Sequence, residues 1–259
     1  MSTYKAIISY LGTNYKGFQK QNSGVATIQN TLEDILRRIT SDKEIKTIGS
    51  GRTDSGVHAN RQVIKISTNS SIPSYGLMKA INDLLPADIK VINLVNCEQS
   101  FHPIRDAIKK EYRYRFSFNK NLDPGLNQMV TNFYGELNID FMKLCCETFK
   151  GKHDFRNYQT VGTDVETTVR EILSAEIIAT TKFSLLSDQP VTIYEFRIVG
   201  TGFLKQMVRL LMGALVEAGK GKVDQNQIKN SLTGNTIQNR LGAVAPPQGL
   251  ALYEVTYPE

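Results

Sequence analysis

The sequence contains few of the residues that build disulfide frameworks and metal sites, with three cysteines and three histidines in 259 residues. An odd number of cysteines, two of them adjacent at Cys145 and Cys146, fits neither a disulfide framework nor a Cys-x-x-Cys metal motif. His58, His102 and His153 stand singly, and we expect each of them to have a structural role. These scarcities predict a protein without a bound metal, in the reducing environment of the cytoplasm.

A long hydrophobic run is also missing. No stretch is long and apolar enough to span a bilayer, and the first five residues lead directly into a strand pattern. We therefore expect neither a signal peptide nor a membrane anchor.

The chain does have enough hydrophobic residues, 41%, for a sizeable core, whether it forms one large domain or two small ones. Its formal net charge of +6 favours an acidic partner, and nucleic acid is the simplest candidate. Because many cytosolic proteins are mildly basic, charge alone is weak support for this partner.

Hydrophobic periodicity in the first half predicts the order βαββαβ, which is the order of a ferredoxin-like fold. The predicted strands span residues 4–10, 45–49, 62–67 and 89–95. Thr27 is suited to cap a helix whose apolar residues share one face, namely Ile28, Leu32, Ile35, Leu36 and Ile39. A second helix begins near Ser74 and carries the apolar residues Leu77, Ala80, Ile81, Leu84 and Leu85.

The second half repeats this order of elements without a repeat in the sequence. Strands are predicted at residues 110–118, 168–179, 191–199 and 250–256, and helices at 139–149, 203–218 and 225–231. The residues of the first of these helices that we expect to face inward are Phe141, Leu144, Cys145 and Phe149. The predicted fold is therefore α+β, with two ferredoxin-like (βαββαβ) halves packed around a central cleft. No flexible linker separates the halves, which implies two packed domains, 1–104 and 105–259.

A glycine-rich run at residues 49–59, Gly-Ser-Gly-Arg-Thr-Asp-Ser-Gly-Val-His-Ala, is the most informative part of the sequence. It lies between two predicted strands, and glycine allows backbone conformations in which a ligand can approach closely. Such a turn can hold Asp54 at the mouth of a cleft, with Arg52 two residues away to contact an anion. An isolated Asp-Ser-Gly is typical of ordinary turns, but the whole string is too long for that explanation.

Other catalytic motifs are incomplete. Residues 213–220 approach a Walker A loop, but the spacing is one residue too long and no Ser or Thr follows the lysine. Gly49-x-Gly51 lacks the third glycine of a dinucleotide-binding motif, and no Gly-x-Ser-x-Gly motif is present. The chain offers a carboxylate, arginines and aromatic residues, so we predict chemistry that needs neither a metal nor a cofactor.

The glycine-rich run resembles the catalytic motif of the TruA family of tRNA pseudouridine synthases, and further segments resemble this family in the same order. These segments are residues 10–19, 111–114, 153–155, 202–209 and 245–250. The resemblance implies two α/β domains with the active site between them. Residues 1–104 would bind RNA and carry the catalytic loop, and residues 105–259 would complete the active site. The chain departs from the family pattern at Phe18 and at residues 59–62 and 101–105, which bears on the RNA contacts.

Within this resemblance, Asp54 is the catalytic nucleophile, which attacks either C1′ of the sugar or C6 of the base. Tyr112 would stack on the flipped uracil and help to remove the C5 proton, and Arg52 would bind the substrate by holding the place of the flipped base. Arg209 would pair with Asp54 and keep it ionised in a dry pocket. Periodicity alone favours another interpretation of Arg209, as a surface residue on the same side of its helix as Lys205.

The sequence therefore predicts a cofactor-independent tRNA pseudouridine synthase that forms a homodimer and modifies uridines of the anticodon stem-loop, just 3′ of the anticodon. The tRNA substrate and the homodimer come only from the family resemblance. Two alternatives stay open: a related enzyme that modifies another structured RNA, and a non-catalytic RNA-binding module, because ferredoxin-like sheets also bind single strands. An intact set of Arg52, Asp54, Tyr112 and Arg209 argues against the module.

Overall fold

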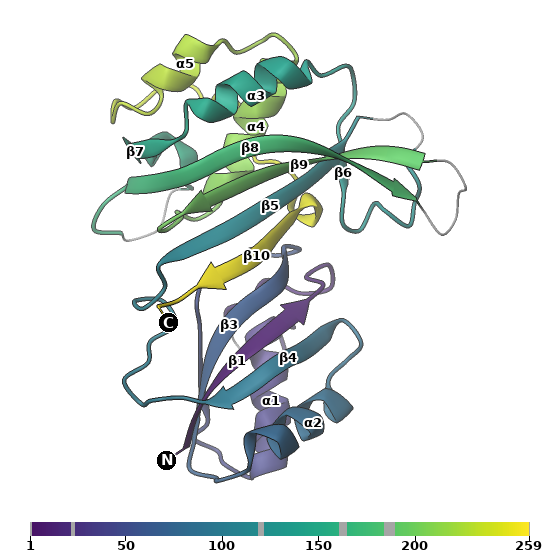
Figure 1. Cartoon of the computed structure of the whole chain (residues 1–259), viewed down its shortest axis with the longest axis vertical. Helices are drawn as coiled ribbons and strands as arrows, with labels where there is room; N and C mark the ends of the chain where they lie inside the picture. Colours follow the sequence, from purple (N-terminus) through teal and green to yellow (C-terminus); the bar gives the residue numbers. More distant parts are fainter. Residues whose placement is uncertain (1, 22–23, 119–121, 161–164, 184–189, 259) are drawn as a thin grey trace. The chain divides into compact units, whose positions relative to one another are not determined.

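The computed structural model of the chain has helices that alternate with mostly antiparallel strands, so the chain is an α+β protein (Figure 1). The structure describes residues 2–21, 24–118, 122–160, 165–183 and 190–258. Contacts divide the chain into two units, which are Met1–Ile108 together with Ala251–Glu259, and Lys109–Leu250. By these contacts the C-terminal residues 251–259 group with the first unit, whereas the division based on sequence assigns them to the second half.

The first unit is built on an antiparallel sheet in the order β4-β1-β3, and β2 also pairs with β3. Its strands are β1 (Ser2–Tyr10), β2 (Lys46–Gly49), β3 (His58–Thr68) and β4 (Ile89–Asn96). The strand β10 (Leu250–Thr256) pairs in parallel with the start of β3, where Ala251 lies opposite His58. The helices α1 (Ile28–Thr40) and α2 (Ser74–Leu84) contact each other, and they contact β2 and β4 respectively.

Helix α1 begins and ends where local chemistry predicts. Thr27 caps it, because the Thr27 Oγ1 accepts a hydrogen bond from the backbone N–H of Asn30 (3.1 Å). Ser41 follows the last turn in a left-handed conformation with a φ of 55°. The predicted inward face is buried at Ile28, Leu32, Ile35 and Leu36. The sequence prediction for this helix is therefore confirmed.

The second unit has strands in the antiparallel order β5-β9-β8-β7, and the short strand β6 pairs with β5. The strands are β5 (Lys109–Ser117), β6 (Thr131–Asn132), β7 (Gly151–Asp154), β8 (Val169–Phe183) and β9 (Pro190–Gly200). The helices are α3 (Ile139–Glu147), α4 (Met207–Gly219) and α5 (Gln225–Asn230), with short 3₁₀ turns at Arg156–Tyr158 and Pro247–Gly249. Helix α3 contacts α4, α5 and β8, and α4 also contacts β5 (Figure 1).

The structure corrects two sequence predictions about the helices of the second unit, the start of α4 and part of the inward face of α3. Helix α4 begins at Met207 and not at residue 203, because Gln206 adopts a left-handed conformation with a φ of 61° that no helical residue has. For α3 the prediction is right for the buried Cys145 and Phe149 but wrong for Leu144, which is 50% exposed, and Met142 and Cys146 are buried as well. The buried face of α3 is therefore rotated from the predicted one, because packing against α4 and β8 selects it.

Strand β5 separates aromatic from charged side chains, as its alternating sequence predicts. On the charged face, Arg115 and Arg197 donate to the buried carboxylate of Glu195 at 3.0 and 2.9 Å. Burial by itself raises the pKa of Glu195, but hydrogen bonds from these two arginines hold it below its ordinary value. The buried rings of the other face are Tyr112, Tyr114 and Phe116.

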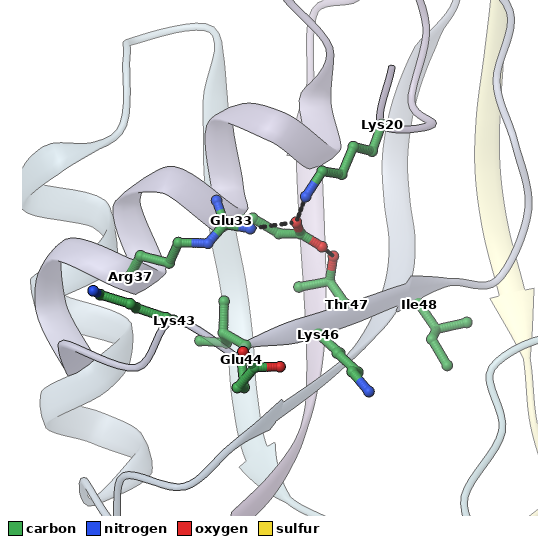
Figure 2. A pocket seen from close by; sticks show the side chains of 9 residues that line it. Lys20, Glu33, Arg37, Lys43, Glu44, Lys46, Thr47 and Ile48 are labelled. Carbon is green, nitrogen blue, oxygen red and sulfur yellow. Dashed lines mark hydrogen bonds and ion pairs between the residues drawn. The ribbon is translucent and has the colours of Figure 1, made fainter. Parts of the chain in front are cut away.

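A buried carboxylate, Glu33 of α1, joins this helix to β2 and to the segment that precedes α1 (Figure 2). One Glu33 oxygen accepts from Lys20 Nζ (2.8 Å) and Arg37 Nη2 (2.9 Å), and the other accepts from the Thr47 hydroxyl (2.8 Å). Burial raises the pKa of Glu33, but the hydrogen bonds from Lys20 and Thr47 and the nearby charges outweigh it and lower the pKa. The ionised form of Glu33 is therefore the one that stabilises the fold.

We expect Glu33→Gln to lower the free energy of unfolding by about 1–3 kcal/mol at neutral pH, because charge-assisted hydrogen bonds to a buried carboxylate are lost. Because solvent screens the ion pair with the half-exposed Lys20, we expect a loss of stability in the lower part of this range. The pKa of Glu33 is lower in the folded than in the unfolded chain. The loss is therefore full above the ordinary pKa of 4.5 and shrinks as the pH falls through the folded value.

Thermal unfolding of both proteins over a range of pH values measures this difference. Asp34→Asn, which removes an exposed acid of the same helix, serves as the control and changes stability by no more than about 0.5 kcal/mol. A loss in Glu33→Gln that does not vary with pH would contradict the role of the ionised carboxylate.

Candidate active site

The glycine-rich loop between β2 and β3 carries the predicted nucleophile. In this loop Asp54 is half-buried and Arg52 is exposed. The buried side chain of Gln62 on β3 holds the start of the loop at two points. Its Oε1 accepts from the Ser50 hydroxyl (2.6 Å), and its Nε2 donates to the Gly51 carbonyl oxygen (2.6 Å). The loop is therefore anchored directly before Arg52.

Residues 10–19, at the end of β1 and beyond it, pack along one side of this loop. The hydroxyls of Tyr10 and Thr53 hydrogen-bond to each other at 2.8 Å, and the backbone N–H of Phe18 donates to the Thr53 carbonyl oxygen (3.1 Å). The Phe18 ring occupies the space over Gly49, where an added Cβ would lie 2.4 Å from the ring. These contacts fix the backbone of the residue that precedes Asp54.

Further contacts hold the loop on the other side of Asp54. The backbone N–H of Gly56 and the hydroxyl of Ser55 both donate to the Tyr15 carbonyl oxygen at 3.2 Å. Within the loop, the N–H of Val57 donates to the Asp54 carbonyl oxygen (3.1 Å). Residues 10–19 and 49–59, which resemble two different motifs of the family, thus form one local structure. The predicted nucleophile lies between the points at which this structure is anchored.

Two glycines make this approach possible. A Cβ at Gly12 would lie 2.0 Å from the Val57 carbonyl oxygen, and a Cβ at Gly17 would lie 2.8 Å from that of Thr53. Gly17 also has a φ of 95°, which side chains disfavour. The N–H of Gly12 donates to Nδ1 of the buried His58 (3.0 Å), which gives this histidine the structural role that we expected.

In the second unit, Tyr112 is 8% exposed, and its ring meets that of Phe203 edge-on with centroids 4.9 Å apart. The left-handed Gln206 keeps Phe203 outside α4, so that its ring is free to face β5. Lys110 lies two residues before Tyr112 on the same face of β5, and burial lowers the pKa of its ammonium group. Lys110 is not among the residues predicted for the site, although the alternation of β5 places it on the same face as Tyr112.

Arg209 of α4 is half-buried, and its Nε donates to the Ala245 carbonyl oxygen (2.7 Å). The N–H of Ala245 donates back to the Arg209 carbonyl oxygen (3.1 Å). The Tyr114 hydroxyl donates to the carbonyl oxygen of Pro246 (2.8 Å), and burial raises the pKa of this hydroxyl. Lys205 is exposed and lies before the start of α4, whereas Arg209 is half-buried within it. The two residues therefore do not lie on one side of the same helix, and the role of Arg209 stays a prediction.

The segment that contains Ala245 approaches α4 through two glycines. A Cβ at Gly213 would lie 1.9 Å from the Ala243 carbonyl oxygen, and a Cβ at Gly242 would lie 2.3 Å from the backbone of Gly213. Close backbone packing therefore brings residues 245–250 to the helix that carries Arg209. Residues 202–209 and 245–250, which resemble two further motifs of the family, are therefore also neighbours in the structure.

The predicted site residues belong to different units. Arg52 and Asp54 share one loop of the first unit, and Tyr112 and Arg209 belong to the second. The pairing of Asp54 with Arg209 stays a prediction. Within the described ranges, no three His, Cys, Asp or Glu side chains gather into a group that could hold a metal. No described helix has the length and apolar character that crossing a membrane requires.

Comparison with known proteins identifies the family. The family model for tRNA pseudouridine synthase matches residues 6–104 and 145–258, which include the loop of Asp54 and helix α4. The chain belongs to the family of tRNA pseudouridine synthases.

Full-length relatives of the family extend the match to β5. The tRNA pseudouridine synthase A of Geobacter sp. (strain M21) is 37% identical over 259 residues, which cover 100% of both chains. That of Bacillus pumilus is 37% identical over 254 residues, 98% of each chain. That of Listeria monocytogenes is 34% identical over 257 residues, which are 99% of this chain and 100% of the relative. The predicted family and the predicted enzyme class, a tRNA uridine isomerase, are confirmed.

We expect Gly12→Ala to destabilise the fold by about 1–3 kcal/mol, because its Cβ would lie 2.0 Å from a carbonyl oxygen and the backbone must shift. The shift displaces the anchored loop, so the rate of uridine isomerisation falls as well. Gly76→Ala in α2 is the matched control, because the nearest atom to its Cβ would lie at 4.0 Å. This control is neutral or stabilises by up to about 1 kcal/mol. Chemical unfolding and activity assays compare the two variants, and equal behaviour would refute the close approach.

Proposed function

We propose that this chain isomerises uridines of the tRNA anticodon stem-loop, just 3′ of the anticodon, with Asp54 as the nucleophile and the target base flipped out of the RNA. The observation that carries the proposal is the match to tRNA pseudouridine synthases along nearly the whole chain. The reaction needs no cofactor. It breaks the C1′–N1 bond, turns the base, joins C1′ to C5 and transfers the C5 proton away, while N1 gains a proton.

In this mechanism the Asp54 carboxylate attacks C1′ of the sugar or C6 of the base and forms a covalent intermediate. The hydrogen bonds of Thr53, Ser55 and Gly56 support this role, because they fix the backbone on both sides of the nucleophile. A carboxylate in a dry pocket stays ionised only with a cation close by. We assign that cation to Arg209, whose position matches the family arginine.

Two further residues act on the base and the RNA. Tyr112 offers a ring for stacking on the flipped uracil and a hydroxyl that assists removal of the C5 proton, and its edge-on contact with Phe203 supports a fixed ring orientation. Arg52 enters the RNA and holds the place of the extruded base. Its exposed side chain on an anchored loop supports this role.

We further propose that the enzyme acts in the cytoplasm as a homodimer, as the family resemblance implies. Each half would be ferredoxin-like, and the two halves would pack around a central cleft. Residues 1–104 would form an RNA-binding domain that carries the catalytic loop, and residues 105–259 would complete the active site. The order β4-β1-β3 with β2 beside β3 supports this fold for the first half. The order β5-β9-β8 supports it for the second.

We expect Asp54→Asn to abolish isomerisation and to leave the affinity for tRNA within a few-fold of the wild type. The amide keeps the shape of the carboxylate, but it is a poor nucleophile and cannot pair with an arginine. Single-turnover assays beside filter binding measure both quantities. Asp83→Asn, which removes an exposed acid of α2, is the control and keeps full activity. Substantial turnover by Asp54→Asn would remove Asp54 from the nucleophile role, and a parallel loss of binding and activity would favour an RNA-binding module.

The position of the product tests the proposed substrate. We expect pseudouridine in the anticodon arm of several tRNAs whose sequences differ there, because phosphate contacts position the RNA without reading its sequence. Carbodiimide-based mapping of total RNA, from cells with and without the gene, measures this directly. Signals lost only from ribosomal or messenger RNA would contradict the tRNA assignment and keep the chemistry. If the cells with the gene express the protein and no pseudouridine signal is lost when the gene is absent, the assignment as an enzyme is contradicted.

A further inference from the structure

A pocket of about 420 Å³ lies in the first unit beside α1 and β2 (Figure 2), and residues 49–59 of the glycine-rich loop do not line it. We call it the β2 pocket. It is lined by Lys20, Glu33, Arg37, Lys43, Glu44, Ile45, Lys46, Thr47 and Ile48. Its charged side chains comprise four cations and two carboxylates, so the lining carries an excess of two positive charges. An excess of this sign attracts an anion.

The buried Glu33 orders two of these cations. Lys20 Nζ and Arg37 Nη2 bind the same Glu33 oxygen at 2.8 and 2.9 Å, although they come from different segments of the chain. Both therefore point to one place from opposite directions, as Figure 2 shows. The carboxylate balances one of the two charges, and the exposed Asp34 contacts Arg37 at 2.7 Å from outside the lining. Their geometry is thus set before any ligand arrives, which lowers the entropy cost of binding.

Lys43 and Lys46 supply the charge that is not balanced. Both side chains are exposed, and among the described residues neither has an ion-pair partner within 4.0 Å. Glu44 between them is also exposed and reduces the excess charge, and among the described residues no ion pair joins it to either lysine. Because Ile45 and Thr47 are buried, the backbone that carries these lysines is held in place. Such an arrangement suits an extended anion with several charges better than a single small ion.

The β2 pocket is joined to the catalytic loop by a short stretch of chain. Lys46 begins β2, and β2 leads directly to Gly49 and the loop of Arg52. Lys46 and Arg52 are six positions apart, so their Cα atoms lie at most roughly 20 Å apart. On the other side, Lys20 follows Phe18, which itself contacts Thr53 of the loop. An RNA whose target uridine lies at Asp54 therefore has neighbouring backbone within reach of the pocket.

We propose that the β2 pocket binds backbone phosphates of the tRNA near the modified uridine. Lys43 and Lys46 make the main contacts, and Lys20 and Arg37, which Glu33 holds in place, add to the positive charge of the pocket. This inference rests on the proposed function, because it takes tRNA as the ligand. Contacts of this kind position the RNA and carry no sequence information. The pocket thus contributes to affinity and leaves the chemical step at Asp54 unchanged.

The test compares two double variants that lose the same charge. Lys43→Ala/Lys46→Ala removes the proposed contacts, and Lys79→Ala/Lys90→Ala removes two exposed lysines of α2 and β4 in the same unit. For the first variant we expect the Kd for tRNA to rise roughly tenfold or more at about 0.1 M salt. We also expect the slope of log K against log salt to become less steep by about 1 to 2. The single-turnover rate at saturating tRNA and the melting temperature stay at the wild-type values.

The control variant should change the Kd by no more than about twofold and keep the wild-type slope. Equal effects in both variants would mean that only the net charge of the protein matters, which would overturn the proposal. An unchanged Kd in Lys43→Ala/Lys46→Ala would overturn it as well. A lower rate at saturating tRNA would also overturn it, because the lysines would then act on the chemistry or the fold. If the wild-type protein bound tRNA and formed no pseudouridine, the proposed function would fail and the salt titration would still decide the pocket.

Discussion

The glycine-rich loop of Asp54 depends on one close contact, in which the backbone of residues 12–17 lies directly against that of residues 53–57. No side chain fits between them at Gly12, where a Cβ would lie 2.0 Å from a carbonyl oxygen. The hydrogen bonds to Thr53 and from Gly56 span this contact, so they exist only at this separation. Such a fixed position suits the nucleophile role that we propose for Asp54, because misplacement by about 1 Å is costly to catalysis. The glycines here serve close packing more than flexibility.

The second unit uses the same device around Arg209. Gly213 and Gly242 let the segment of Ala245 lie against α4, and Arg209 then binds Ala245 with both its backbone and its side chain. A half-buried guanidinium needs acceptors. The Ala245 carbonyl oxygen is one such acceptor, and it orients the guanidinium through Nε.

The cations of the first unit are organised differently. Glu33 is buried and ionised, and it orders Lys20 and Arg37 by balancing part of their charge. Glu195 plays a comparable role for the arginines of β5 and β9. Buried acids thus order neighbouring arginines and lysines in both units, whereas Arg52, Lys43 and Lys46 are exposed.

The sequence by itself determined what local signals encode. The Thr27 cap, the apolar face of α1, the alternation of β5 and the family of the glycine-rich motif all follow from residues close together in the chain. It did not determine the inward face of α3 or the start of α4, since packing decides the first and the left-handed Gln206 decides the second. Only the tertiary structure decided which segments meet. Tyr10 and Thr53 are 43 positions apart and Arg209 and Ala245 are 36 apart, and hydrogen bonds over such separations leave no periodic pattern in the sequence.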